Sequence, residues 1–111
     1  LYKGIKETDL MIYVSTIDTC AEGMFGFGDS CDWDQYDRPI AGIINFCYGA
    51  IRLDSEGKPS PKSLFTATET AIHEIAHVLG LRSKDIAYFY DWKTGLPRSP
   101  REEDGNVGRG K

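Results

Sequence analysis

Both histidines of the chain fall in one pentapeptide, HEIAH, at residues 73–77. Helical residues four apart lie on one face, so His73 and His77 can each direct a ring nitrogen at a single tetrahedral Zn²⁺. Glu74 between them is placed to act as general base for an attacking water. Gly80 follows at helical spacing. The pattern is typical of a zinc hydrolase and predicts His73 and His77 as metal ligands and Glu74 as the catalytic residue.

An amphipathic helix must position these side chains. At about 100° per residue, Thr66 and Thr70 share a polar stripe with the two histidines. The apolar residues fill an arc from roughly 120° to 260°; they are Leu64, Ala67, Ala71, Ile72, Ile75, Val78 and Leu79. We expect a helix that is buried on most sides and shows its histidines to a cleft. A buried helix whose histidines only hydrogen-bond to neighbours is the alternative.

Local signals define the ends of this helix. Ser60 can cap the first turn, with Pro61 at the first helical position. The helix is expected to run to about Leu79, where Gly80 can adopt the left-handed conformation that ends it. Ser83 is expected to cap a short second helix over residues 84–90.

Strand signals precede the helix. Residues 10–17 and 40–47 are β-branched and aromatic runs that predict buried strands. Residues 20–28 carry three glycines and form either a loop or a glycine-interrupted edge strand. Residues 29–38 are acidic and predict a turn. After Asp91, glycines and prolines break every period, which predicts a turn-rich loop over about 91–111.

Composition narrows the class of protein. With 111 residues and 41% hydrophobic content, the chain has enough apolar residues for the core of one domain or a piece of one. A net charge of −4 without a basic stripe argues against nucleic acid as a partner. No apolar run approaches the roughly 20 residues of a membrane span. Three cysteines, Cys20, Cys31 and Cys47, allow one disulfide with a third partner elsewhere, or three thiols.

A catalytic zinc normally takes three protein ligands, and the motif supplies two. In the compact metzincin pattern HExxHxxGxxH the third histidine would stand at the position of Ser83. Cys47 as the third ligand would make a Cys/His/His zinc amidase of the deformylase type, although Ala76 departs from that motif. The remaining candidates are downstream carboxylates: Asp85, Asp91, Glu102 and Glu103.

Longer segments around the motif resemble the leishmanolysin family of zinc metallopeptidases, a metzincin group. The matching positions, which span residues 8 to 101, are residues 8–10 with Tyr13 and Val14, Cys31, residues 38–42 with Asn45, and residues 88–91 with Gly95, Pro97 and residues 100–101. Residues 24–28, MFGFG, depart from the Leu-Ala-Trp-Ala-like strand of that family.

The resemblance implies one Zn²⁺ bound by His73 and His77, with Glu74 as acid/base and a third histidine beyond the position of Lys111. Residues 1–111 would then be a partial catalytic domain of a zinc metalloendopeptidase, inactive alone, whose substrates are proteins or peptides. The expected fold is α+β, a metzincin-like N-terminal subdomain with a small twisted sheet packed on the HExxH helix. Family members are often at the cell surface or extracellular, and some are intracellular. A catalytically idle adhesion or binding module is the alternative, against which the intact Glu74 argues.

Overall fold

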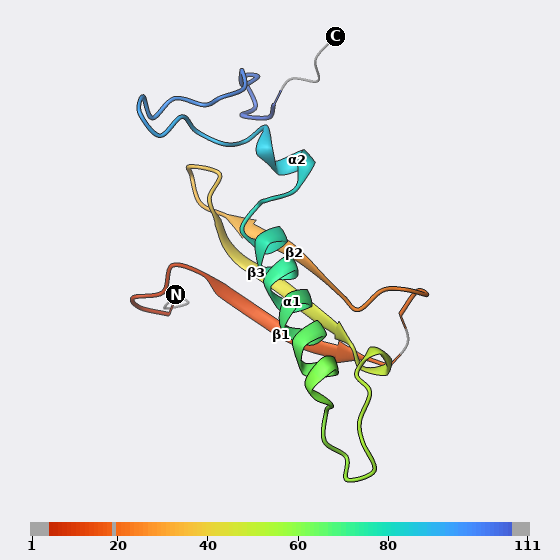
Figure 1. Cartoon of the computed structure of the whole chain (residues 1–111). Coiled ribbons are helices and arrows are strands. Elements are labelled where there is room, and N and C mark those ends of the chain that lie inside the picture. The colour runs from red at the N-terminus through yellow and green to blue at the C-terminus, as the bar shows by residue number, and fades with distance from the viewer. Residues whose placement is uncertain (1–4, 19, 108–111) are drawn as a thin grey trace.

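The computed structural model describes residues 5–18 and 20–107, which form one small sheet with a long helix on it (Figure 1). The elements in chain order are β1 (Met11–Ile17), β2 (Gly26–Trp33), β3 (Pro39–Cys47), the 3₁₀ turn η1 (Tyr48–Ala50), α1 (Pro61–Val78) and α2 (Ser83–Ile86). The α+β class expected from the sequence is therefore confirmed.

The sheet has the order β1-β3-β2. Strand β1 runs parallel to β3, with Tyr13 opposite Ile43, and β2 runs antiparallel to β3, with Gly28 opposite Ile44. Because β3 is paired on both sides, its side chains are the best buried of the three strands, and Ile44 and Cys47 are each only 3% exposed. The strands predicted at 10–17 and 40–47 are confirmed as strands, and β3 is buried as predicted. The prediction that the first strand is buried is wrong, because β1 is an edge strand in which Tyr13 and Val14 are 62% and 65% exposed.

The prediction of a turn over residues 29–38 is wrong for its first half. Strand β2 continues to Trp33, and the turn is confined to residues 34–38. Backbone pairing with β3 is sufficient here, because an edge strand does not require apolar side chains. The carboxylate of Asp34 then closes the turn by accepting backbone N–H groups of Tyr36 and Arg38 at 2.9 and 3.0 Å.

Helix α1 begins and ends where the sequence predicted. The hydroxyl of Ser60 accepts a backbone N–H of the first turn at 3.1 Å, and Pro61 is the first helical residue. At the other end Gly80 has a φ of +84°. The N–H groups of Gly80 and Leu81 bond back to carbonyls of the last turn at 3.0 and 2.9 Å, which is the Schellman arrangement.

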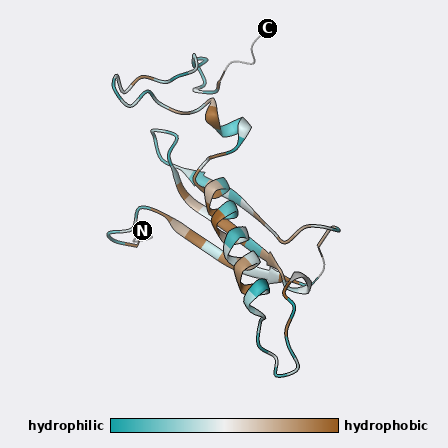
Figure 2. Cartoon of the chain, in the orientation of Figure 1, coloured by the Kyte–Doolittle hydropathy of each residue, from teal (hydrophilic) through white to brown (hydrophobic). Residues whose placement is uncertain are grey.

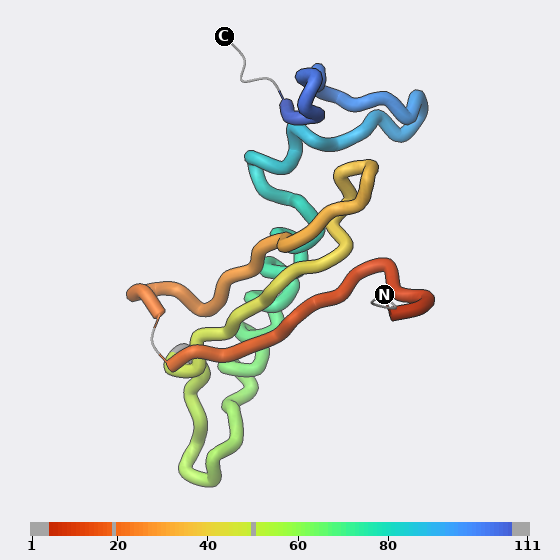
Figure 3. The backbone as a smooth tube through the Cα atoms, turned by 180° about the vertical axis from the view of Figure 1, so that it is seen from behind, coloured from red at the N-terminus to blue at the C-terminus, as the bar shows by residue number. Residues whose placement is uncertain are grey.

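Helix α1 covers one face of the sheet across β2 and β3, and the view from behind shows the strands in front of it (Figure 3). The prediction that this helix is buried on most sides is wrong. Within α1 the buried residues are Glu74 and Val78, whereas Leu64 and Ile72 are 58% and 64% exposed. A single sheet can cover only one side of a helix, so hydrophobic residues along α1 stay on the surface (Figure 2).

The chain after α1 contains less regular structure than predicted. Helix α2 ends at Ile86 instead of near residue 90, and no side chain caps its start, so the predicted cap at Ser83 is wrong. Residues 90–107 form turns with two isolated bridges, Tyr90 to Pro97 and Arg101 to Val107. Residues 108–111 of the predicted loop lie outside the described residues. Within the described part, every helix is too short or too polar to cross a membrane.

One disulfide links the loop after β1 to the end of the central strand. Cys20 is bonded to Cys47 with a Cα–Cα distance of 5.8 Å, and Cys31 is exposed and free. Of the two alternatives that the sequence left open, the structure therefore has one disulfide and one thiol.

Candidate metal centre

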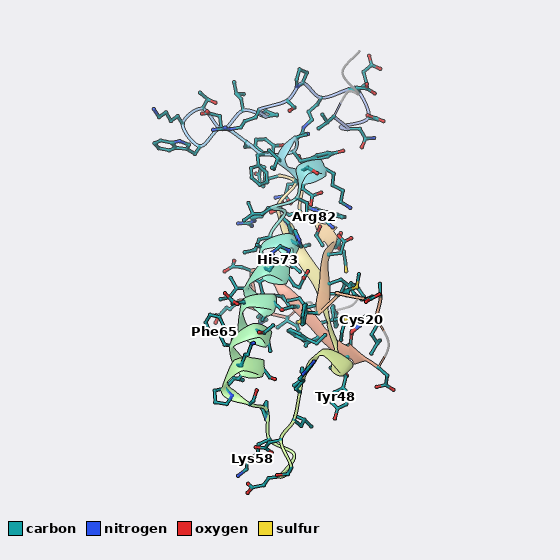
Figure 4. The ribbon with its side chains drawn as sticks, turned by 45° about the vertical axis from the view of Figure 1, so that its right-hand side comes forward. Cys20, Tyr48, Lys58, Phe65, His73 and Arg82 are labelled. Carbon is teal, nitrogen blue, oxygen red and sulfur yellow. A yellow bond between two sulfur atoms is a disulfide. The ribbon has the colours of Figure 1, made fainter. Side chains whose placement is uncertain are left out.

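The two histidines meet on the C-terminal half of α1, where Figure 4 labels His73. Their Nε2 atoms lie 2.9 Å apart, and the rings are 4.5 Å apart between centroids with planes at 86°. Two nitrogens bound to one tetrahedral Zn²⁺ at the usual bond length lie about 3.3 Å apart. The observed convergence therefore fits a shared metal ion after a small adjustment. The same distance also suits a hydrogen bond between two neutral rings.

The surroundings of the two rings differ. His73 is exposed, whereas His77 is half-buried and its Nδ1 is a buried atom without a partner among the described residues. A metal-bound histidine usually donates its second N–H to an acceptor, which fixes the ring and its tautomer. The described residues supply no such acceptor to His77.

The side chain of Glu74 lies on the face of α1 that packs against β2, and the residue is 7% exposed. A Cβ built on Gly28 would lie 3.0 Å from the Cβ of Glu74, and one on Gly26 would lie 3.7 Å from its Cγ. The glutamate side chain therefore extends along β2 from Gly28 towards Gly26. The helix thus directs the two imidazoles to one point and holds the carboxylic side chain between itself and the sheet.

Cys47 and Asp85, two of the candidate third ligands, have other partners. Cys47 is bonded to Cys20, which removes it as a thiolate ligand and leaves the Cys/His/His arrangement without its cysteine. The carboxylate of Asp85 accepts a hydrogen bond from Nε of Arg82 at 2.5 Å.

The remaining carboxylates belong to turns. Asp91 accepts the backbone N–H groups of Thr94 and Lys93 at 2.9 Å each, and these bonds lower its pKa. Glu102 and Glu103 are exposed in the turn beyond Arg101. Across residues 5–18 and 20–107, no three His, Cys, Asp or Glu side chains gather as a metal-binding group. The structure therefore brings together the two predicted histidine ligands and none of the candidate third ligands.

Arg82 was not singled out from the sequence, and it joins the end of α1 to the sheet. Its guanidinium donates to Asp29, to Asp85 and, at 2.8 Å, to the hydroxyl of Ser30, and its side chain is only 13% exposed. Burial alone would lower the pKa of Arg82, but the carboxylates of Asp85 and Asp29 outweigh it and raise the pKa. The only sequence signal was a basic residue two positions after Gly80, the predicted helix stop.

Known proteins match nearly the whole chain. The leishmanolysin family model matches residues 1–93. A leishmanolysin-like peptidase of Drosophila melanogaster is 36% identical over 106 residues, which cover 92% of this chain and 14% of that protein. A leishmanolysin-like peptidase of Caenorhabditis elegans is 33% identical over 109 residues, covering 95% of this chain and 15% of that protein.

A ciliated left-right organizer metallopeptidase of Xenopus laevis is 30% identical over 92 residues, covering 79% of this chain and 12% of that protein. No solved structure matches the chain. The chain spans about one-seventh of the length of the leishmanolysin-like relatives. Because the family model covers most of the chain and the resemblance read from the sequence agrees with it, this chain belongs to the leishmanolysin family of metallopeptidases.

Proposed function

We propose that this chain is part of the catalytic domain of a zinc-dependent metalloendopeptidase that cleaves protein or peptide substrates. The observation that carries the proposal is the convergence of the His73 and His77 Nε2 atoms at 2.9 Å on a helix that also bears Glu74. Two imidazoles and one intervening glutamate are the donor set and the base that zinc peptidases use.

The roles of the residues follow from their chemistry. His73 and His77 would hold the zinc, which when bound supplies the positive charge that activates water and polarises the scissile carbonyl. Glu74 takes the proton from the attacking water and then delivers it to the leaving amine. The burial of Glu74 against β2 supports this role, because the surrounding helix and strand limit the positions that its side chain can adopt.

We further propose that the sheet and α1 form the N-terminal subdomain of a metzincin-like domain, with the third zinc ligand supplied from outside the described residues. Support comes from the two-ligand site and from the Schellman turn at Gly80, which redirects the chain directly after the second histidine. The two histidines and the third ligand would together bind one zinc ion per catalytic domain.

The decisive experiment uses Glu74→Gln in the full-length protein. We expect bound zinc to stay at the wild-type level and peptide hydrolysis to fall by about 10²- to 10⁴-fold, because the water loses its base. Glu69→Gln is the matched control, since Glu69 is an exposed carboxylate on the same helix. Turnover of Glu74→Gln within tenfold of wild type at equal zinc content would refute the role of Glu74. A zinc-loaded wild-type protein that hydrolyses no peptide would instead favour an idle adhesion module.

We also propose an oxidising location, at the cell surface or outside the cell. The Cys20–Cys47 disulfide supports this proposal, because such bonds persist mainly in oxidising compartments. Mass spectrometry of the native protein after alkylation tests it. Two alkylated thiols at Cys20 and Cys47 without prior reduction would contradict the proposal.

A further inference from the structure

Strand β2 lies close to helix α1 at Gly28, opposite Glu74. An alanine Cβ at Gly28 would lie 2.5 Å from the backbone carbonyl oxygen of Glu74 and 3.0 Å from its Cβ. Real Cβ atoms essentially never approach another heavy atom to less than 3.0 Å. Both nearby atoms belong to the rigid part of the residue, so a side-chain rotation cannot relieve the contact. Only a glycine at position 28 allows β2 to lie this close to the helix.

The strand cannot move away without breaking other contacts. Gly28 lies opposite Ile44 in the register of β2 with β3, and Ile44 is 3% exposed. On the next turn of the helix, Val78 is fully buried against the same sheet. The position of β2 is therefore set by the sheet, and the distance between strand and helix is set by the missing side chain of Gly28.

We propose that Gly28 is a positioning residue for the general base: its lack of a side chain determines how Glu74 is held relative to the two histidines. The inference rests on the proposed function, because it assigns Gly28 an effect on the proton-transfer step. An alanine there would move the backbone at Glu74, or β2, by about 1 Å, and displacements of that size can cost 10²-fold in rate.

The experiment compares two glycine-to-alanine variants of the full-length protein. Gly28→Ala should lower kcat by about 10- to 100-fold while KM changes less than about twofold and zinc content stays at the wild-type level. Gly42→Ala is the matched control, because its Cβ would collide at the same helix–sheet interface with Val78 and, at 2.9 Å, with the backbone oxygen of Asp29 in β2, but not with Glu74. It should lower the melting temperature comparably and leave kcat within about threefold of wild type. Equal losses of kcat in the two variants would overturn the proposal.

A double-mutant cycle separates this inference from the proposed function. If Gly28 acts through Glu74, then adding Gly28→Ala to Glu74→Gln should cause less than about threefold further loss of kcat, because residues that act as a unit are non-additive. A full additional loss would overturn the positioning role. A Glu74→Gln variant that keeps its activity would instead refute the proposed function itself.

A second variant keeps the proposal testable if Gly28→Ala does not fold. An alanine Cβ at Gly26 would meet the Asn45 carbonyl oxygen at 2.9 Å and Thr70 Cγ2 at 3.1 Å, but Glu74 Cγ only at the ordinary distance of 3.7 Å. Gly26→Ala should therefore lose stability and keep kcat within about threefold. A hundredfold loss of kcat in Gly26→Ala would contradict a specific role for Gly28, because any disturbance of β2 would then suffice.

Discussion

Helix α1 and the segment of residues 81–107 contact the sheet in different ways. Helix α1 meets the sheet through close backbone approach at glycines and through buried Val78. The segment of residues 81–107 is instead attached through polar side chains, with Arg82 bound at the middle of β2 (Figure 4 labels Arg82) and Tyr90 and Arg101 bound at the β2–β3 turn.

The Arg101 contact shows the character of this attachment. Its Nη2 donates to Asp37 at 2.8 Å and to the backbone oxygen of Tyr88 at 2.9 Å. The guanidinium also lies 4.7 Å from the ring centroid of Tyr88 and 5.7 Å from that of Tyr90. A hollow of about 470 Å³ opens beside this contact, lined in part by Trp33 and Tyr88. The attachment is polar and loosely packed compared with the helix–sheet interface.

The difference indicates where the chemistry can reside. A zinc site needs side chains held within a fraction of an ångström, which a close-packed interface provides. Polar anchors on a turn-rich segment tolerate displacement, because a few hydrogen bonds can re-form in several geometries. We therefore expect residues 81–107 to influence stability more than metal binding.

The largest effect is expected on the zinc affinity of the 111-residue chain, which tests whether residues 81–107 contribute a metal ligand. With two imidazoles and no third protein ligand in the described part, its affinity should be more than about 100-fold weaker than that of the full-length protein, since loss of even an outer-shell partner costs about 10- to 100-fold. Titration against a competing chelator measures it, with His77→Ala as the variant that should abolish binding. Tight binding that depends on Asp85 or Cys47 as strongly as on His77 would place a ligand where the structure has none.

Removal of the arginine anchors should have an intermediate effect. Arg82→Ala leaves partly buried Asp85 without its partner and should lower the free energy of unfolding by about 1 to 3 kcal/mol, measured by urea denaturation. Arg82→Lys keeps the charge but loses the fork of donors, so only part of the stability should return.

Arg101→Ala should chiefly release the segment of residues 91–107 from the β2–β3 turn. Under a broad-specificity protease we expect the first cuts within residues 91–107, earlier than in wild type, while residues 11–80 resist. First cuts within α1 would reverse the proposed order of stability between the two regions.

The smallest effect concerns the acid response of the terminal segment. The backbone N–H groups of Thr94 and Lys93 hold the pKa of Asp91 below its ordinary value of 3.8. Because the folded-state pKa is the lower one, this contribution to the turn is present above pH 3.8 and is lost as the pH falls through the folded value. A carboxyl-detected NMR titration should give a midpoint below 3.8 in the folded chain and the ordinary value in urea. Equal midpoints in both states would mean that the turn is not formed in solution.

Local rules made a large part of this protein predictable from sequence. The histidine pair, the cap at Ser60 and the stop at Gly80 each depend on residues within one or two helical turns, so neighbours in sequence suffice to define them. The strands at 10–17 and 40–47 were equally clear, because their β-branched and aromatic runs are continuous. The family resemblance came from the same local segments.

The tertiary structure decided the features that depend on contacts between residues far apart in the sequence. The side of α1 that is buried, with Glu74 against Gly28, depends on where β2 lies, and hydrophobic periodicity alone placed the buried arc too far round the helix. The extension of β2 through its acidic residues depends on pairing with β3, and the Cys20–Cys47 bond joins residues 27 apart. The sequence by itself determined which side chains are candidates for the chemistry. The packing of a strand on a helix decided how those side chains are held, because a contact distance depends on both elements and cannot be read from either one alone.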